Sequence, residues 1–279
     1  MERLSDLFFE LSHENRLEIL GMLMTGPTKL THIAVKMDNS SQEAHRHLSR
    51  LLDAGLVAKT PEGDYKITSY GSLVMRLVPG YDFLTKNSEY FMTRDTSLIP
   101  DRFMARVGEL SESVLVNDVL VTLFDLEVMI KESEEYACIM INQMVMNLYK
   151  PLIAASDRGV TIKVIRPRGW QLPDDVAEKI DRETLMEAFQ RVELGKITQK
   201  ETEVLPAFMA YSEKQVAALS FARLDGGIDY LGFKADDEKA SSWCHELFDY
   251  IWDRASRADI DPVRARHLLS LERRPSDAP

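Results

Sequence analysis

The sequence predicts an α+β chain that contains an N-terminal winged helix-turn-helix domain, a helical linker and a C-terminal α/β domain. Near the N-terminus, apolar residues recur at helical spacing, and a polar turn separates two of these segments before two short strand-like runs. Farther along, buried-strand patterns alternate with helical ones, as in α/β units. We therefore expect a winged helix-turn-helix domain over 1–78, a linker and dimerisation segment over 79–96, an α/β sensor domain over 97–258, and a C-terminal helix and tail over 259–279.

Composition places the chain among folded globular proteins. It has 279 residues, 45% of them hydrophobic, with only 13 glycines and 11 prolines. The start lacks the positively charged and apolar regions of a signal peptide, and no apolar run approaches the roughly 20 residues that cross a bilayer. Cys138 and Cys244 are too few for a disulfide framework. We expect a cytoplasmic protein with no membrane partner.

Charge is distributed unevenly along the chain. The formal net charge is −11, but residues 26–76 hold seven basic and five acidic side chains, a local balance of +2. A DNA-binding protein needs only a local basic surface, so an acidic average does not exclude it. This pattern indicates that one small domain contacts DNA and that the larger domain has another role.

The elements of the first domain follow from spacing and breakers. Gly26-Pro27 interrupts the helical pattern, Asp38-Asn39-Ser40 forms a tight polar turn, and Gly55 ends the helix after that turn. The residues 61–64 connect two strand-like runs as a hairpin, which would be the wing. The predicted helices cover 4–11, 13–23, 31–37 and 41–54, and the predicted strands cover 56–60 and 65–68.

The helix over 41–54 is the expected recognition helix, because the second helix of such a turn enters the major groove. Its apolar face consists of Ala44, Leu48, Leu51 and Leu52, which should pack on the domain core. The opposite face should contact DNA through Ser41, Gln42, His45, Arg46 and Ser49.

Side-chain chemistry assigns roles within this set. Gln42 can form a bidentate pair with adenine, and Arg46 with guanine. Arg50, and Lys59 and Lys66 on the wing, are expected to bind phosphates without regard to sequence. The alternative is a winged helix that binds another protein and never contacts bases.

Two histidines of the same helix raise the question of a metal site. His45 and His47 lie two positions apart, so they point in different directions, and no third ligand is near in the sequence. We expect no metal here, and we expect His47 to be a partly buried packing residue.

The linker is predicted to hold a short helix over 73–78 that ends at Pro79-Gly80. The next segment, 81–91, places Phe83 and Leu84 seven residues ahead of Tyr90 and Phe91, which gives an aromatic stripe. This stripe either forms a homodimer interface or packs on the C-terminal domain of its own chain, and both can hold together.

The C-terminal domain is predicted to be a mixed sheet covered by helices. Predicted helices cover 119–135, 148–157 and 239–257, and predicted strands cover 136–141, 160–166, 205–211, 216–221 and 228–233.

Several segments together resemble a known family. The run from Ser41 to Val57, Gly63 to Thr68, Arg106-Val-Gly-Glu-Leu110 and the strand 160–166 with its Trp-containing loop are similar to archaeal winged-helix regulators with an ArsR-like DNA-binding domain and a methanogenesis-regulator-type C-terminal domain. The resemblance implies an archaeal transcription regulator that binds double-stranded DNA as a homodimer. The helix, Asp157-Arg-Gly-Val160 and strand arrangement also resembles half of a phospholipase-D-like fold, which some archaeal sugar regulators use for effector sensing.

Enzymes of the phospholipase-D fold use a His-x-Lys-x4-Asp run with a histidine nucleophile. The most similar strand in this chain places Val204, Pro206 and Tyr211 at those positions, and none of them can perform that chemistry. The sequence also lacks a Gly-rich phosphate loop and metal-ligand spacing. We therefore predict a protein that is not an enzyme and needs no cofactor.

The C-terminal domain offers one candidate effector site. Arg166, Arg168 and Trp170 follow a predicted strand, and ligands of α/β sheets often lie at the carboxyl ends of strands. Two guanidiniums beside an indole could hold an anionic small molecule. The alternative is a surface loop whose arginines pair with the many carboxylates of the domain.

Overall fold

The computed structural model describes residues 2–143, 145–170 and 181–258. The chain divides into two compact units, Met1–Asp82 and Phe83–Pro279, and each is described separately. The helix and tail expected over 259–279 lie outside the described residues.

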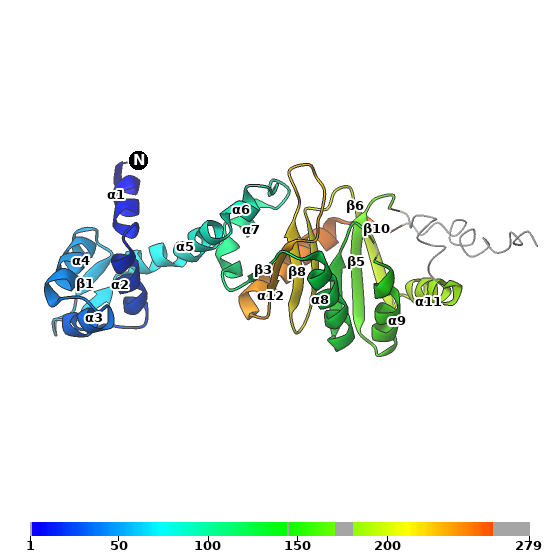
Figure 1. Cartoon of the computed structure of the whole chain (residues 1–279), viewed down its shortest axis with the longest axis horizontal. Helices are drawn as coiled ribbons and strands as arrows, with labels where there is room; N and C mark the ends of the chain where they lie inside the picture. The colour runs from blue at the N-terminus through cyan, green and yellow to red at the C-terminus, as the bar shows by residue number, and fades with distance from the viewer. Residues whose placement is uncertain (1, 144, 171–180, 259–279) are drawn as a thin grey trace, which may run out of the picture. The chain divides into compact units, whose positions relative to one another are not determined.

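The first unit is a winged helix-turn-helix fold (Figure 1). Its elements are α1 (Glu2–Leu11), α2 (Glu14–Met24), α3 (Leu30–Lys36), α4 (Ser41–Asp53), β1 (Val57–Lys59), β2 (Tyr65–Ile67) and the start of α5 (Ser69–Lys86). The predicted order of helix, turn, helix and hairpin is confirmed.

The turn between α3 and α4 fixes where the recognition helix begins. Ser40 is the N-cap of α4, and its hydroxyl accepts a hydrogen bond from the backbone N–H of Glu43 at 3.1 Å. The Ser40 hydroxyl also donates to the Glu43 carboxylate at 3.3 Å. Inside the unit, Ile19, Leu48 and Leu51 are fully buried, so the apolar face of α4 lies against the core.

The wing is a two-stranded antiparallel hairpin in which Val57 pairs with Ile67 and Lys59 with Tyr65. The start of α5 packs closely behind it. A Cβ added at Gly71 would lie 2.2 Å from the carbonyl oxygen of Leu56, so only glycine allows this approach without a backbone shift.

The structure corrects the prediction that a helix ends at Pro79-Gly80. Helix α5 runs from Ser69 to Lys86 with Pro79 inside it. A proline removes one helical hydrogen bond and costs about 3 kcal/mol in a helix interior, so packing must favour the continuous helix. Its C-terminal part supplies Phe83 to the core of the second unit, which provides that packing.

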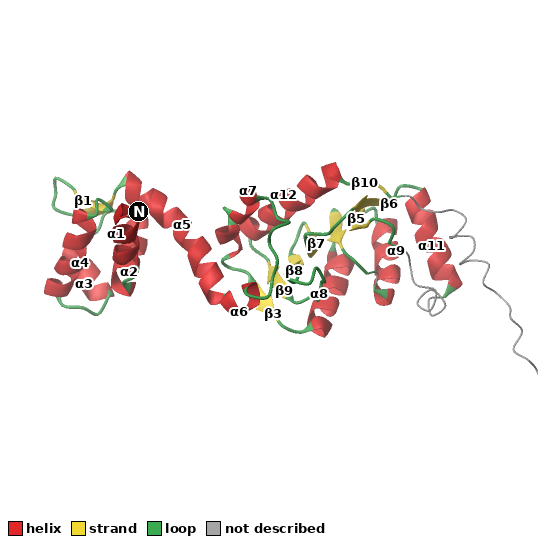
Figure 2. Cartoon of the chain, turned by 90° about the horizontal axis from the view of Figure 1, so that it is seen from above, coloured by secondary structure: helices red, strands yellow, loops and turns green. Residues whose placement is uncertain are grey.

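The second unit is a mixed eight-stranded sheet with helices on both faces (Figures 1 and 2). Its strands are β3 (Val114–Val116), β4 (Tyr136–Met140), β5 (Thr161–Pro167), β6 (Ile197–Thr202), β7 (Ala207–Ser212), β8 (Val216–Phe221), β9 (Gly232–Ala235) and β10 (Ser256–Arg257). Its helices are α6 (Ser88–Phe91), α7 (Asp101–Met104), η1 (Val107–Leu110), α8 (Val119–Glu132), η2 (Met146–Leu148), α9 (Tyr149–Asp157), α11 (Arg182–Glu193) and α12 (Glu238–Arg254).

The strand order is β10-β6-β5-β4-β7-β8-β9-β3, with β4, β5 and β6 parallel and the other pairs antiparallel. Helices α8, α9 and α11 pack on one face, and α12 covers the other. The predicted α/β class is therefore confirmed. The strand expected over 228–233 instead covers 232–235, and β3, β6 and β10 were not predicted.

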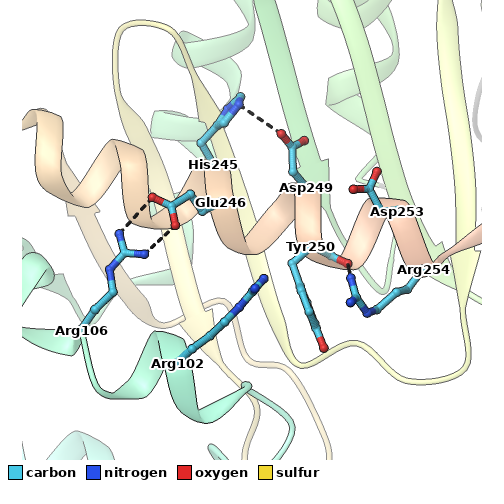
Figure 3. Close-up of a pocket in the computed structure, with 8 residues that line it drawn as sticks. All are labelled: Arg102, Arg106, His245, Glu246, Asp249, Tyr250, Asp253 and Arg254. Carbon is cyan, nitrogen blue, oxygen red and sulfur yellow. Dashed lines mark hydrogen bonds and ion pairs between the residues drawn. The ribbon is translucent and has the colours of Figure 1, made fainter.

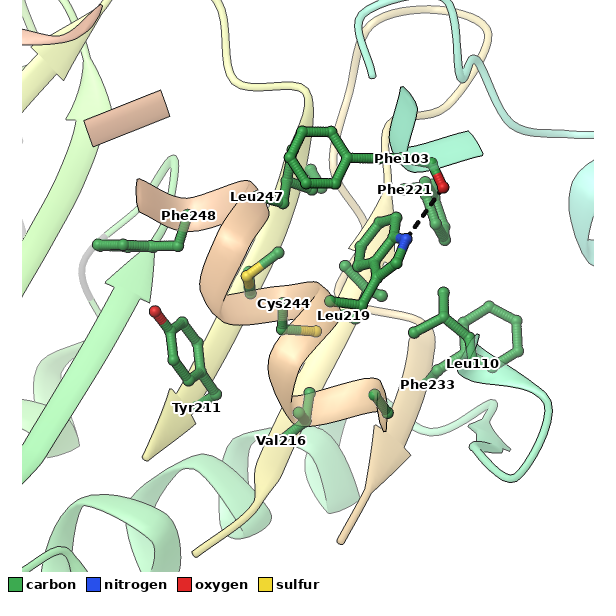
Figure 4. Packing of buried hydrophobic residues seen from close by; sticks show 14 of the residues in the cluster. Phe103, Leu110, Tyr211, Val216, Leu219, Phe221, Phe233, Cys244, Leu247 and Phe248 are labelled. Atoms are coloured by element: carbon green, nitrogen blue, oxygen red, sulfur yellow. Dashed lines mark hydrogen bonds between the residues drawn. The ribbon is translucent and has the colours of Figure 1, made fainter. Parts of the chain in front are cut away.

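The core under α12 is rich in aromatic side chains (Figure 4). Trp243 is fully buried, and its indole N–H donates to the carbonyl oxygen of Phe103 at 3.0 Å. A buried indole N–H needs a hydrogen-bond acceptor, and the carbonyl of Phe103 provides it. Since Trp243 lies on α12 and Phe103 on α7, the bond also links these two helices.

The aromatic stripe of residues 81–91 packs largely against other residues of the same chain. Phe83 and Tyr90 are buried and contact Phe233, with ring centroids 4.9 and 5.0 Å apart. The Tyr90 hydroxyl accepts from the backbone N–H of Phe221 at 2.9 Å and donates to the carbonyl of Leu231 at 3.1 Å. Of the two alternatives for this stripe, packing on its own C-terminal domain is the one observed. A homodimer cannot use these buried rings without opening that core.

Candidate nucleic-acid interface

The N-terminal half of α4 presents polar side chains to solvent. Ser41, Gln42, His45 and Arg46 are all exposed, and Ser49 is half-buried. They share the side of α4 opposite Ala44, His47, Leu48 and Leu51, which are buried. The structure thus brings the predicted base-contacting residues together on one exposed helix face.

His47 is more deeply buried than expected, with 3% of its surface exposed. Its ring lies 4.5 Å from that of His13, and the Nδ1 atoms of both rings are buried without a hydrogen-bond partner. Burial lowers the pKa of His47, and the nearby positive charges of Arg46 and Arg16 lower it further. Within the described ranges, no group of three or more possible metal ligands occurs.

The two wing lysines are exposed, but they do not point the same way. Lys59 pairs with Tyr65, and Lys66 pairs with Ala58. Neighbouring residues of a strand point to opposite faces, so Lys59 shares the face of Tyr65 while Lys66 lies on the other face. The Lys59 ammonium lies 5.2 Å from the centroid of the Tyr65 ring.

Arg50 is in a different situation from the other predicted contacts, because a carboxylate of α1 binds it. Its Nε donates to Oε2 of Glu10 at 3.0 Å, and its Nη2 contacts Oε1 of the same carboxylate. The hydrogen bond from Arg50 lowers the pKa of Glu10, and the charge of Arg16 adds to the effect. Glu10 was not predicted as a partner of Arg50, because it lies 40 residues away and belongs to no recognisable motif.

The first unit also carries an exposed apolar surface, here called the α1/α5 face. It consists of Leu4 and Phe8 on α1 and Leu73, Leu77 and Tyr81 on α5, all exposed. The rings of Phe8 and Tyr81 meet edge to face with centroids 5.8 Å apart. Isolated exposed apolar residues are ordinary, whereas contiguous exposed apolar patches are typical of interaction surfaces.

The predicted effector loop lies at the end of β5, and carboxylates neutralise its arginines. Arg166 binds Glu201 at 2.9 Å, and the two side chains are only 14% and 9% exposed. Arg168 pairs with Glu203 and is half-exposed. The Arg166 guanidinium lies 5.5 Å from the Trp170 ring, so the expected cation–aromatic contact is present. The arginines are nevertheless paired as in the alternative interpretation.

A surface pocket of about 480 Å³ lies along α12 (Figure 3). Arg106 binds Glu246 at 2.5 and 3.0 Å, and His245 Nε2 lies 3.2 Å from Asp249. The Nδ1 atom of His245 lies 3.3 Å from the hydroxyl of Tyr211, but that residue is fully buried and burial raises its pKa. A buried phenol held in its neutral form is a poor nucleophile. Two pairs of groups in this pocket, Arg106 with Glu246 and His245 with Asp249, thus interact as surface ion pairs.

Comparison with known proteins identifies the first unit. Residues 11–60 match a family described as a helix-turn-helix domain. The N-terminal unit is a winged helix-turn-helix domain. None of the curated protein sequences compared with the chain matches it.

Solved structures show more distant similarity. TrmBL2, described as an archaeal chromatin protein with a novel mode of DNA binding, is 13% identical, with a TM-score of 0.41 over 88% of this chain and 94% of that one. The phospholipase D family member Nuc from Salmonella typhimurium is 12% identical, with a TM-score of 0.35 over 53% of this chain and 97% of that one.

No helix in the described part of the chain is long and apolar enough to cross a membrane.

Proposed function

We propose that this protein is a transcription regulator that binds double-stranded DNA through α4. The observation that carries the proposal is the exposed polar N-terminal half of a capped α4 within a winged helix-turn-helix domain. Gln42 and Arg46 contact base edges in the major groove, with Ser41, His45 and Ser49 beside them. The wing contributes Lys59 and Lys66, which bind phosphates.

Arg50 has a smaller part in this proposal than the sequence indicated. Its guanidinium already binds Glu10, whose side chain is only 11% exposed. A phosphate would compete with Glu10 for this guanidinium, and breaking the pair would leave Glu10 with Arg16 as its remaining charged partner.

The regulator acts as a homodimer in this proposal, and the α1/α5 face is its interface. Two copies are needed to contact two half-sites about 34 Å apart, and a two-fold interface must be complementary to itself. A face with Leu73, Leu77 and Tyr81 on one helix meets this need, because the same apolar side chains can meet across the axis. The interface therefore shifts from the buried aromatic rings of 83–91 to the exposed residues before them.

The C-terminal unit is the candidate sensor, with Arg166, Arg168 and Trp170 as the effector site. An anionic effector would have to displace Glu201 and Glu203, so a ligand with more than one negative charge fits better than a monoanion. It would alter DNA binding only if it bound the two functional states with different affinity. No catalytic step is part of this proposal.

Genome-wide footprinting of the native protein tests the proposed function. Discrete, two-fold symmetric sites upstream of genes support it, and salt-sensitive binding of such a fragment in vitro confirms direct contact. If the protein protects no DNA site and instead binds another protein through the α1/α5 face, it is a protein-interaction module, which is the alternative function considered for the winged helix.

A further inference from the structure

Glu10, near the end of α1, connects three helices of the first unit. Its carboxylate binds Arg50 of α4 through both oxygens, and its Oε2 lies 3.2 Å from Nε of Arg16 of α2. Arg16 also donates to the backbone carbonyls of Glu10 and Phe9, each at 2.6 Å. A buried arginine therefore satisfies the free carbonyls at the end of α1, where a positive charge is favourable.

The ring of Phe9 strengthens the same junction. The guanidinium of Arg50 lies 5.1 Å from its centroid, and that of Arg16 lies 5.8 Å away. The carboxylate and the ring thus hold both arginines in one geometry, and bidentate binding of Arg50 fixes its orientation as well as its distance.

The two ends of this junction have different proposed roles. Helix α1 carries Leu4 and Phe8 of the α1/α5 face. Helix α4 carries the proposed base contacts in its first turns, and Arg50 lies in its last turn. A rotation of α4 relative to α1 would therefore change the position of the base contacts with respect to the dimer interface.

We propose that Glu10 is a positioning residue that sets the distance between the two recognition helices of the dimer. It does so by fixing α4 to α1 through Arg50. The inference rests on the proposed function, and it gives Arg50 a role in dimer geometry instead of a direct DNA contact. Binding to a single half-site needs only the face of α4, whereas binding to two half-sites also needs the correct separation.

The test compares wild type, Glu10→Gln and the matched control Glu18→Gln in the full chain. Glu18 is an exposed carboxylate on α2, so the control removes the same charge. The probes are a footprinted promoter fragment, the same fragment with one half-site randomised, and versions in which the half-site separation differs by one or two base pairs. Binding is measured by fluorescence anisotropy.

We expect Glu10→Gln to lose roughly tenfold or more of the preference for two half-sites over one, while single-half-site affinity stays within about twofold. We also expect a flatter dependence on half-site separation, a change that a loss of folded protein would not produce. Arg50→Gln keeps the pair between Glu10 and Arg16 and should give the same result. This variant replaces Glu10→Gln in the test if Glu10→Gln folds poorly.

Other outcomes overturn the proposal. Unchanged spacing dependence in both variants removes the positioning role. Tighter binding of all fragments by Glu10→Gln would show that Glu10 competes with DNA for Arg50. If wild type binds none of the fragments in a salt-dependent way, the proposed function itself fails and this inference falls with it.

Discussion

The imidazole rings of His13 and His47 lie 4.5 Å apart beneath the recognition helix, and each has a buried Nδ1 without a partner. Burial keeps the pKa of His47 below its usual value, and the charges of His13, Arg46 and Arg16 act in the same direction against a smaller opposing effect of Glu43. The folded domain therefore disfavours a proton on His47, whereas the unfolded chain accepts one near the usual pKa of about 6.5.

This relationship predicts that the winged helix-turn-helix domain loses stability as the pH falls below about 6.5 and keeps it above. His47→Phe retains a ring and removes the titration, so its stability should change less between pH 7.5 and 5.5 than that of wild type. The stability of the domain at each pH is measured by urea unfolding, with hydrogen exchange of the α4 amides as the probe. His45→Gln, an exposed neighbour, is the control, and an identical pH response in wild type and His47→Phe would refute the assignment.

Base and phosphate contacts should respond differently to substitution. Arg46→Ala should cost about 1–3 kcal/mol and relax specificity at one operator position. Lys59→Ala and Lys66→Ala should weaken binding to all sequences alike, and each should reduce the slope of log affinity against log salt by about 1. Titrations on operator and random DNA separate these effects. Equal losses on both DNAs for Arg46→Ala would place it among the phosphate contacts.

The α1/α5 face should control assembly. Leu77 is 62% exposed in the single chain, so Leu77→Asp should leave folding intact while it puts a charge into the proposed two-fold interface. Sedimentation at micromolar concentration should show a wild-type dimer and a monomeric variant. Leu224→Asp, at a comparably exposed site of the second unit, should remain dimeric. A wild-type monomer would contradict the interface.

The ion pair of Arg166 and Glu201 predicts an asymmetry within the effector loop. Arg166→Ala leaves a carboxylate buried without its partner and should destabilise the second unit by about 3–5 kcal/mol. Arg168→Ala breaks an exposed pair and should change stability by no more than about 0.5 kcal/mol. Denaturant unfolding of the two variants provides the comparison, and equal stability would show that the buried pair is unimportant.

Ligand binding at this loop is tested with Arg168→Ala, the variant that is expected to keep its stability. Inorganic pyrophosphate, a small multiply charged anion, is a suitable first probe for wild type and Arg168→Ala. We expect the wild type alone to show saturable binding that shifts DNA affinity. Binding that is equal in both proteins would move the effector site elsewhere in the unit.

The winged domain could be predicted because its signals are local. The polar turn at Asp38-Asn39-Ser40, the helix end at Gly55 and the apolar face with Ala44 and Leu48 all depend on residues close in the sequence. Strands β4 and β5 were predicted for the same reason, since β4 is a short apolar run and β5 alternates between apolar and polar residues.

The remaining features depend on contacts between distant residues. Strand β6 reads Ile-Thr-Gln-Lys-Glu-Thr, and its pairing with β5 and β10 overrides a mostly polar pattern. Pro79 suggested a helix end, but packing continues α5 beyond it. The partners of Arg50 and Arg166 lie 40 and 35 residues away, and no sequence spacing reveals such pairs.

Binding of DNA bases by α4 is tested most directly by the salt dependence of binding of the full chain to its footprinted operator and to random DNA of the same length. We expect tighter binding to the operator at every salt concentration, by roughly a thousandfold or more near physiological salt, and a linear fall of log affinity with log salt for both DNAs. Equal affinity for the two DNAs, or binding that does not change with salt, would contradict a regulator that contacts bases through α4.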